Sequence, residues 1–481
     1  MKAASIARAR TGLLRGEWSC SELVENCLQR IDEGTHLNAF IFVLVERARR
    51  QAEEIDQKAK SGAVGKLAGT VLAIKDNIVI KGERVTCGSR ILENFVSPYD
   101  ATVIERLQAE DAVIIGKTNM DEFAMGSSNE NSCCGPVKNP VDETCVPGGS
   151  SGGSCVAVAS GMVLAGLGSD TGGSVRQPAS FCGVVGLKPT YGRISRYGLV
   201  AFASSLDQIG PIANSVEDAA RLLQVLAGRD DRDSTSASVK VPDFPTVVAK
   251  NVRGLRVGLP KEYFAQGLAP DVRSALEAAI ANLKSNGVDF VDVSLPHTDY
   301  AIACYYILAT AEASSNLARY DGVRYGFRAK GVVDLEDMYV KTRSQGFGEE
   351  VKRRIMLGTY VLSAGYYDAY YRKAQKVRTL IRRDFDSAFE HCDCILAPTS
   401  PTTAFKLGER VDDPLTMYLS DIYTVSANLS GLPAISVPCG LDSNKLPIGA
   451  QVIGKPFDEE VVLRVGDSIH KSSLVEGPTY K

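Results

Sequence analysis

Histidine is scarce in this sequence, which limits the catalytic mechanisms that it could support. The four histidines, His36, His297, His391 and His470, lie in four separate segments, and none is beside a glycine- and serine-rich loop. A Ser-His-Asp triad needs a histidine next to its nucleophile. The sequence therefore disfavours such a triad, unless the fold brings one of these residues in from a distant segment.

Other features that would define a protein class are also absent. No apolar run is long enough to span a bilayer, and the start shows no signal-peptide pattern. The twelve cysteines form no C-x-x-C pair, so they do not predict a zinc site. The net charge of −3 argues against a surface dominated by nucleic-acid binding. These absences favour a cytoplasmic protein with reduced cysteines.

What is present is an ordinary globular composition, with 44% hydrophobic and 23% charged residues. Short apolar runs alternate with helical patterns such as 103–109 and 271–286, which is typical of an α/β architecture with a largely buried sheet. The expected strands are 71–74, 112–115, 162–167, 255–259, 288–293, 394–398 and 434–438.

Helices are expected near the start of the chain. Ser19 and Glu22 form a capping box that begins a helix continuing to Arg30, and a second, highly charged helix should cover about 44–60. The polar stretch 229–248 is interpreted as an exposed loop. We expect one domain, with an N-terminal helical region (1–65), a core (66–460) and a C-terminal tail (461–481).

The most unusual stretch runs from Pro147 to Gln177. Two Gly-Gly-Ser triplets, ending at Ser150 and Ser174, flank an apolar segment of small residues at 155–167. Glycines let a substrate approach the main chain closely, and successive N–H groups of such a loop can stabilise an oxyanion. Flexible turns would explain one triplet, but two around an apolar segment favour a function.

A short stretch inside this region, 149–153, formally matches the G-x-S-x-G nucleophile elbow. That motif needs a strand directly before it, whereas Val146-Pro147-Gly148 precedes it here. It also needs a histidine. We therefore look for a different base to activate a serine.

Lys75 is the candidate base. It ends the apolar run 71–74 and is followed by Asp76. Burial at the end of a strand would lower the pKa of its ammonium from about 10.4, so that part of it is neutral and basic near neutral pH. From the local sequence alone, an ordinary ion pair between Lys75 and Asp76 is the simpler interpretation.

Three separated segments, at matching spacing, resemble the amidase signature family. They are G-G-S-S-G-G-S at 148–154, G-S-D-T-G-G-S-V-R-Q-P-A at 168–179 and A-I-K-D-N at 73–77. The resemblance covers roughly residues 65–460 and implies a central, mostly buried mixed sheet flanked by helices on both faces. It also implies amide hydrolysis by a Ser–cis-Ser–Lys triad.

Carried over position by position, the resemblance assigns roles to residues of this chain. Ser174 resembles the nucleophile, Ser150 the bridging serine in a cis peptide, and Lys75 the base. The oxyanion would be stabilised by the backbone N–H groups of four consecutive residues, Thr171, Gly172, Gly173 and Ser174. The mechanism that the resemblance implies uses no metal.

Three further segments, 116–128, 343–354 and 417–424, resemble the glutamine-hydrolysing chains of bacterial glutamyl-tRNA(Gln) amidotransferases, a branch of that family. In that branch an arginine holds the α-carboxylate of glutamine, an aspartate its α-ammonium, and a tyrosine lies in the pocket. By position these resemble Arg354, Asp421 and Tyr305, and Arg353 stays open as an alternative to Arg354. A guanidinium and a carboxylate together match a free amino acid.

The same resemblance implies partners. A B subunit would hold Glu-tRNA(Gln) and activate it with ATP and Mg²⁺, while a C subunit would brace the pair in a heterotrimer without a membrane contact. No cofactor is expected in this chain. The basic segment 372–383 is interpreted as a solvated face or a partner interface. Two alternatives remain: a free-standing amidase of small aliphatic or aryl amides, and a catalytically inactive scaffold or tRNA-binding module.

Overall fold

A computed structural model describes residues 5–264, 267–411 and 413–473 of the chain. The strands are β1 (Phe40–Val43), β2 (Val71–Lys75), β3 (Val113–Thr118), β4 (Ala165–Asp170), β5 (Val185–Lys188), β6 (Gln208–Ala213), β7 (Arg256–Pro260), β8 (Asp289–Val293), β9 (Cys394–Pro398), β10 (Ala434–Leu441) and β11 (Pro447–Gly454). Among the described residues they form one 11-stranded sheet, in the order β1-β3-β2-β4-β6-β5-β10-β11-β9-β7-β8. The sheet is mixed, because β2 is parallel to both β3 and β4 whereas β4 and β6 are antiparallel.

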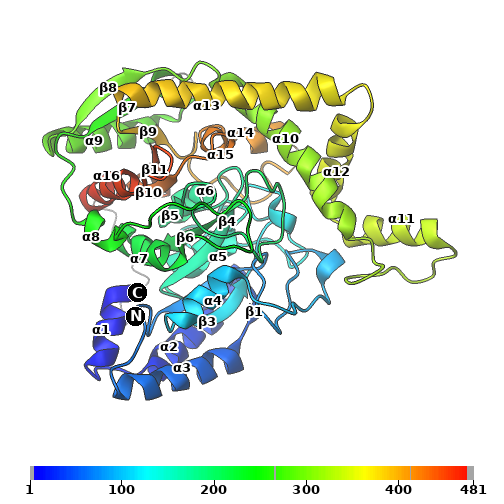
Figure 1. The fold of residues 1–481 in the computed structure, drawn as a ribbon, viewed down its shortest axis with the longest axis horizontal. Coiled ribbons are helices and arrows are strands. Elements are labelled where there is room, and N and C mark those ends of the chain that lie inside the picture. The colour runs from blue at the N-terminus through cyan, green and yellow to red at the C-terminus, as the bar shows by residue number, and fades with distance from the viewer. Residues whose placement is uncertain (1–4, 265–266, 412, 474–481) are drawn as a thin grey trace.

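Helices surround this sheet (Figure 1). They are α1 (Ile6–Leu14), α2 (Cys20–Glu33), α3 (Val45–Lys60), α4 (Thr102–Ala109), α5 (Gly152–Ala159), α6 (Arg176–Cys182), α7 (Val216–Leu226), α8 (Phe244–Val248), α9 (Pro270–Ser285), α10 (Ala301–Asn316), α11 (Leu335–Gly346), α12 (Glu349–Leu362), α13 (Lys373–His391), α14 (Pro414–Leu419), α15 (Val425–Leu429) and α16 (Glu459–Ser472). Within the described ranges, none of them is both long and apolar enough to cross a lipid bilayer.

Both faces of the sheet are buried. In β2, Leu72 and Ile74 belong to a core cluster with residues of α4 and α7, while Val71 and Ala73 belong to a second cluster with residues of α1, α2, α3 and α5. Successive side chains of a strand point to opposite faces, so a strand of continuous apolar residues fits a position between two helical layers. The predicted fold, a central mixed sheet with helices on both faces, is confirmed.

The seven predicted strands are all present, although the one predicted at 162–167 begins later, at Ala165. Four strands were missed: β1, β5, β6 and β11. Two of these, β5 and β1, are only four residues long, and β1 lies inside the region predicted as helical. The strand β6 pairs with β4 on one side and with β5 on the other. It was missed because it contains Gly210 and Pro211, and glycine and proline normally argue against a central strand.

The two ends of the chain differ in how well they match the prediction. The capping box of Ser19 and Glu22 starts α2, as predicted. The predicted tail, 461–481, is wrong in its first part, because α16 packs on β10 and β11 and buries Val462 and Leu463 in the core. Residues 474–481 of that tail lie outside the described residues. The stretch 229–248 is mostly irregular, with short turns, but it ends in the short helix α8.

Candidate active site

Lys75 and the two serine loops meet at the carboxyl ends of two neighbouring parallel strands. β2 and β4 pair from Leu72–Ala165 to Ile74–Leu167. β2 ends at Lys75, and β4 ends at Asp170, directly before the loop that carries Ser174. The carboxyl ends of such strands are where α/β proteins commonly bind ligands. The fold therefore brings together three segments that are far apart in the sequence.

The side chain of Lys75 is fully buried and lies against two serines. Its Nζ donates hydrogen bonds to Ser150 Oγ at 2.7 Å, to Ser151 Oγ at 2.8 Å and to the Ser169 carbonyl oxygen at 3.3 Å. The predicted base and the predicted bridging serine are thus in direct contact. Ser151 was not predicted as part of this cluster, although it is adjacent to Ser150 in the glycine-rich motif.

The simpler interpretation of Lys75, an ion pair with Asp76, is wrong. Asp76 instead pairs with Lys117, 2.9 Å away, and both of these side chains are completely buried. Asp76 also accepts a hydrogen bond from the Thr86 backbone N–H at 2.8 Å. Consecutive residues of an extended segment point to opposite faces, so Lys75 and Asp76 have different neighbours.

Burial lowers the pKa of Lys75 to about 7, because the charged ammonium loses its hydration. The negative charges of Asp121 and Asp170 act in the opposite direction but are weaker than this effect. An amine with such a pKa is partly neutral near pH 7 and can accept a proton from a hydroxyl group.

The peptide bond between Gly149 and Ser150 is cis, as the resemblance implied. The Gly149 N–H donates to Gln177 Oε1 at 3.0 Å, and Gln177 Nε2 donates to the Ser127 carbonyl oxygen at 3.0 Å. Gly148 has a φ of 79°, and a Cβ on it would lie 2.4 Å from Gln177 Oε1. The first glycine of the motif is therefore required both by its backbone conformation and by a close neighbour.

Ser174 is the one residue of the predicted triad with accessible surface. It is 9% exposed, whereas Lys75 and Ser150 are 0% exposed. The Ser151 N–H donates to the Ser174 carbonyl oxygen at 3.1 Å, which connects the two serine loops. A substrate could therefore reach Ser174 first, with the other two residues behind it.

The loop 171–174 presents unpartnered backbone N–H groups. Those of Thr171, Gly172 and Ser174 donate no hydrogen bond to any residue of the described ranges. The Gly173 N–H, by contrast, donates to Asp170 Oδ1 at 2.9 Å. Buried N–H groups without partners are rare, and three in one loop can stabilise an oxyanion. Three of the four predicted N–H groups are therefore available, and Gly173 is not.

Asp170, which was not predicted as a site residue, holds this loop in place. It pairs with Arg176 at 3.0 Å, and both side chains are completely buried. It also accepts hydrogen bonds from the Val175 N–H at 3.2 Å and from Asn428 Nδ2 at 2.9 Å. Burial alone would raise the pKa of Asp170, but the Arg176 charge holds it well below its usual range. The sequence did contain a signal for this role, namely an acidic residue shortly before the second Gly-Gly-Ser triplet.

Replacing Asp170 by alanine should leave Arg176 buried without its counter-charge. We expect the free energy of unfolding to fall by about 3–5 kcal/mol, as for other buried pairs that lose one partner. The control is Glu217→Ala, which removes the 52% exposed partner of Arg221 and should cost less than about 1 kcal/mol. Urea unfolding followed by circular dichroism measures both; equal losses would show that the buried pair contributes no more than the exposed one.

The predicted substrate-binding residues Tyr305 and Asp421 lie close to the same loop. A Cβ on Gly172 would be 2.7 Å from the hydroxyl oxygen of Tyr305, so Tyr305 packs directly on the loop. Thr424, three residues after Asp421, donates to the Gly172 carbonyl oxygen at 2.6 Å. Burial raises the pKa of Asp421 to about 7, although Ser127 donates a hydrogen bond to its carboxylate. A bound ammonium group would favour the charged form.

Arg354 is buried between aromatic rings. Its guanidinium carbon lies 5.2 Å from the centre of the Tyr306 ring and 5.5 Å from that of Tyr418. Its Nε donates to Glu350 Oε1 at 2.8 Å, whereas its two Nη atoms donate no hydrogen bond within the described part of the chain. The Arg354 side chain is 4% exposed and that of Arg353 is 45% exposed. This difference favours Arg354 as the ligand of a carboxylate.

A pocket of about 110 Å³ is lined by both Arg353 and Arg354, and also by Gly126, Ser128 and Tyr418. Gly126 and Ser128 belong to the serine-ended segment 116–128, and Tyr418 to the segment 417–424. Three segments selected from the sequence for substrate binding therefore border one pocket.

Comparisons with known proteins agree with this geometry. The amidase family model matches residues 22–463. A protein of Koribacter versatilis (strain Ellin345), named as the A chain of a glutamyl-tRNA(Gln) amidotransferase, is 58% identical over 467 residues, which are 97% of this chain and 97% of that protein.

Solved structures show the same relationship. The crystal structure of the corresponding glutamyl-tRNA(Gln) amidotransferase chain from Thermotoga maritima has a TM-score of 0.81 at 46% identity, and the match covers 97% of this chain and 95% of that one. A bacterial aryl acylamidase has a TM-score of 0.86 at 24% identity over 98% of this chain and 96% of that one, which shows the shared fold. The resemblance seen in the sequence is confirmed, and the chain belongs to the amidase signature family.

Proposed function

We propose that this chain hydrolyses glutamine to glutamate and ammonia, as the glutaminase component of a glutamyl-tRNA(Gln) amidotransferase. The observation that carries the proposal is the contact of the fully buried Lys75 with Ser150 Oγ, beside a loop with unpartnered N–H groups. The name of the Koribacter relative, which matches nearly the full length of the chain, supports the choice of substrate.

In the first half of the proposed reaction, Ser174 Oγ attacks the side-chain amide carbon of glutamine. The proton of Ser174 passes to Ser150, and Ser150 passes its own proton to the neutral amine of Lys75. The negative charge that develops on the amide oxygen is stabilised by the N–H groups of Thr171 and Gly172 and by that of Ser174 itself. This stage ends at a tetrahedral intermediate.

The intermediate then collapses. Lys75, through Ser150, protonates the nitrogen, the carbon–nitrogen bond breaks, and ammonia leaves. The γ-glutamyl group remains as an ester on Ser174. Water attacks the ester with the same two residues as base, the carbon–oxygen bond to Ser174 breaks, and glutamate leaves with Ser174 protonated again.

The pocket beside this centre would hold the other end of glutamine. The Nη atoms of Arg354 donate to the α-carboxylate, and the Asp421 carboxylate accepts from the α-ammonium. Tyr305, packed on Gly172, closes the space between the amino-acid end and the amide end. The two opposite charges select a free amino acid over an uncharged amide.

The ammonia would be used by partners of this chain. We propose that a B subunit holds Glu-tRNA(Gln) and activates its carboxyl group with ATP and Mg²⁺, and that a C subunit completes a heterotrimer. Copurification of the tagged chain from its natural source tests this assembly. Recovery of the chain alone, with full activity on simple amides, would indicate a free-standing amidase instead.

Arg354→Gln should lower kcat/KM for glutamine roughly 10- to 100-fold, because a hydrogen bond to a charged group is lost. The effect should appear mainly in KM, since the charge binds substrate and transition state alike. Propionamide has no carboxylate, so its slow hydrolysis should not change. An assay of released ammonia measures both substrates.

Arg353→Gln is the matched control, because it removes the same charge from the neighbouring, exposed position. It should leave kcat/KM for glutamine within about twofold because the Arg353 guanidinium, although it also lines the pocket, pairs with Glu350 and is 45% exposed to solvent. A large loss in the Arg353 variant with none in the Arg354 variant would reverse the assignment. Equal activity of the unmodified protein on glutamine and propionamide would argue against glutamine as the substrate.

A further inference from the structure

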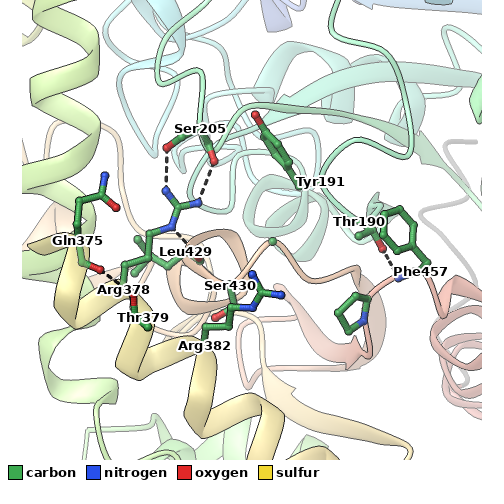
Figure 2. A pocket seen from close by; sticks show the side chains of 12 residues that line it. Thr190, Tyr191, Ser205, Gln375, Arg378, Thr379, Arg382, Leu429, Ser430 and Phe457 are labelled. Atoms are coloured by element: carbon green, nitrogen blue, oxygen red, sulfur yellow. Dashed lines mark hydrogen bonds between the residues drawn. The ribbon is translucent and has the colours of Figure 1, made fainter. Parts of the chain in front are cut away.

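A second cleft, of about 530 Å³, lies between α13, the residues that follow α15, and two loops around Tyr191 and Phe457. Figure 2 shows the 12 side chains that line it. None of them belongs to the proposed catalytic centre or to the proposed glutamine pocket. The cleft therefore calls for a separate explanation.

The cleft carries positive charge without a matching acid. Arg378 and Arg382, both from α13, line it, and none of the other lining residues is acidic. Arg378 is held in place, because it donates to the Leu429 carbonyl oxygen at 2.8 Å and to Ser205 Oγ at 2.9 Å. Arg382 is an exposed residue that forms no hydrogen bond or ion pair with any described residue, and its guanidinium points toward the middle of the cleft (Figure 2).

An unpartnered hydroxyl group lines the same cleft. Ser430 is 8% exposed, and its buried Oγ has no hydrogen-bond partner within the described ranges. A buried hydroxyl without a partner costs free energy and needs an explanation, such as a ligand.

Opposite α13, the rings of Tyr191 and Phe457 line the cleft from two separate loops (Figure 2). Arg196 lies over the Tyr191 ring and Arg193 over the Phe457 ring, but both of these arginines pair with acids. The uncompensated charge of the cleft is therefore on the α13 side, and its apolar surface is on the other.

We propose that this cleft binds a small phosphorylated ligand of nucleotide size. The phosphate would lie on Arg382, with the Ser430 side chain rotated so that its hydroxyl reaches the phosphate, and the ring of the ligand would lie against Tyr191 or Phe457. A guanidinium group binds phosphate oxygens in pairs, and a hydroxyl group can donate to a third. The volume of the cleft lies within the range of about 300–1,000 Å³ that is typical of small-molecule sites.

A chain of contacts connects this cleft with the loop that carries Ser174. Arg378 donates to the carbonyl oxygen of Leu429, the last residue of α15, and Ser430 directly follows that helix. Asn428, also in α15, donates to Asp170 Oδ1 at 2.9 Å. Asp170 in turn fixes Gly173. A ligand that draws Arg382 and Ser430 together would act on α15, so binding should change the rate of glutamine hydrolysis. This second effect rests on the proposed function, whereas binding does not.

Isothermal titration calorimetry of the full chain with AMP tests the site. We expect AMP to bind more tightly than inorganic phosphate, and adenosine to bind at least about tenfold more weakly than AMP, because adenosine lacks the charge. Arg382→Gln should raise the Kd for AMP about tenfold or more. Arg383→Gln removes the same charge from the next position of α13, which is also exposed but does not line the cleft, and should change the Kd less than about twofold.

Three results would overturn the proposal: no binding of AMP at millimolar concentration, equal binding of AMP and adenosine, or equal losses in the two arginine variants. Equal losses would mean that the net charge of α13, and not the cleft, attracts the ligand. Glutamine hydrolysis with saturating AMP tests the second effect. The kcat should change in the unmodified chain and in the Arg383 variant but not in the Arg382 variant; an unchanged kcat in all three would refute the coupling and leave the calorimetric result standing.

Discussion

Ser174→Ala should lower kcat for glutamine hydrolysis about 10⁶-fold, the size of loss that follows removal of the nucleophile in other serine hydrolases. Without the Ser174 hydroxyl no acyl-enzyme can form, so only direct attack by water remains. Glutamine should still bind with similar affinity, because Arg354 and Asp421 are untouched. The remaining rate should reflect substrate binding and the free N–H groups of the loop.

A covalent probe makes this result specific to Ser174. A fluorophosphonate should label the unmodified protein at Ser174, as read by mass spectrometry of peptides, and should not label the alanine variant. Ser160→Ala is the control, since Ser160 lies at the end of α5, outside the proposed site, and its Oγ has no hydrogen-bond partner among the described residues. That variant should keep its activity and its labelling. Label on Ser150 or Ser151, with activity retained in the Ser174 variant, would move the nucleophile to the other loop.

Lys75→Arg should lower kcat about as much as Lys75→Ala, by roughly 10²–10⁴-fold, the usual contribution of a general base. Arginine keeps the positive charge but does not lose its proton at these pH values, so it cannot take the proton of Ser150. A Lys75→Arg variant with most of its activity would show that the residue acts only as a positive charge.

The pH profile gives a second test of Lys75. In the free protein its pKa is about 7, and the neutral form is the active one, so activity should rise with pH through about 7 and level off above it. Asp421, whose pKa is also about 7 and whose charged form would bind the α-ammonium, contributes to the same rise in kcat/KM, so the profile is best measured as kcat at saturating glutamine. Lys188 is a suitable control, because it is also fully buried with a pKa lowered to about 7, yet it donates to the Pro189 carbonyl oxygen. Lys188→Met should keep the same midpoint. A midpoint that moves in this variant would assign the profile to Lys188.

The residues of the candidate catalytic centre could be selected from the sequence because they lie in short motifs or at the end of an apolar run. Ser150 and Ser174 each end a Gly-Gly-Ser triplet, and Lys75 ends an apolar run that the structure confirms as a buried strand. Strand–helix alternation likewise predicted the α/β fold. In each of these cases the local pattern and the tertiary environment agree, which is the condition for a reliable prediction.

The supporting residues could not be predicted in this way, because their partners are remote in the sequence. Asp170 has a local partner in Arg176, but its contact with Asn428 is remote, and the choice between Arg353 and Arg354 depends on which face of α12 is buried against Tyr306. The strand β6 was missed for a similar reason: its Pro211 pairs with Leu167 of β4, whereas β5 pairs only with Ile212 and Ala213, so the proline lies outside the pairing on that side. In all three cases the outcome depends on tertiary contacts, which the local sequence propensity does not encode.

The proposed chemistry and the proposed selectivity come from different parts of the chain. Lys75, Ser150 and Ser174 belong to the strands and loops of the first half, whereas Arg354 and Asp421 come from helices and loops of the second half that only border the centre. Such a division lets evolution exchange one part while it preserves the other. Duplicated genes could therefore diverge toward new amides through changes around α12 and α15, while the fold, which a bacterial aryl acylamidase shares, is kept.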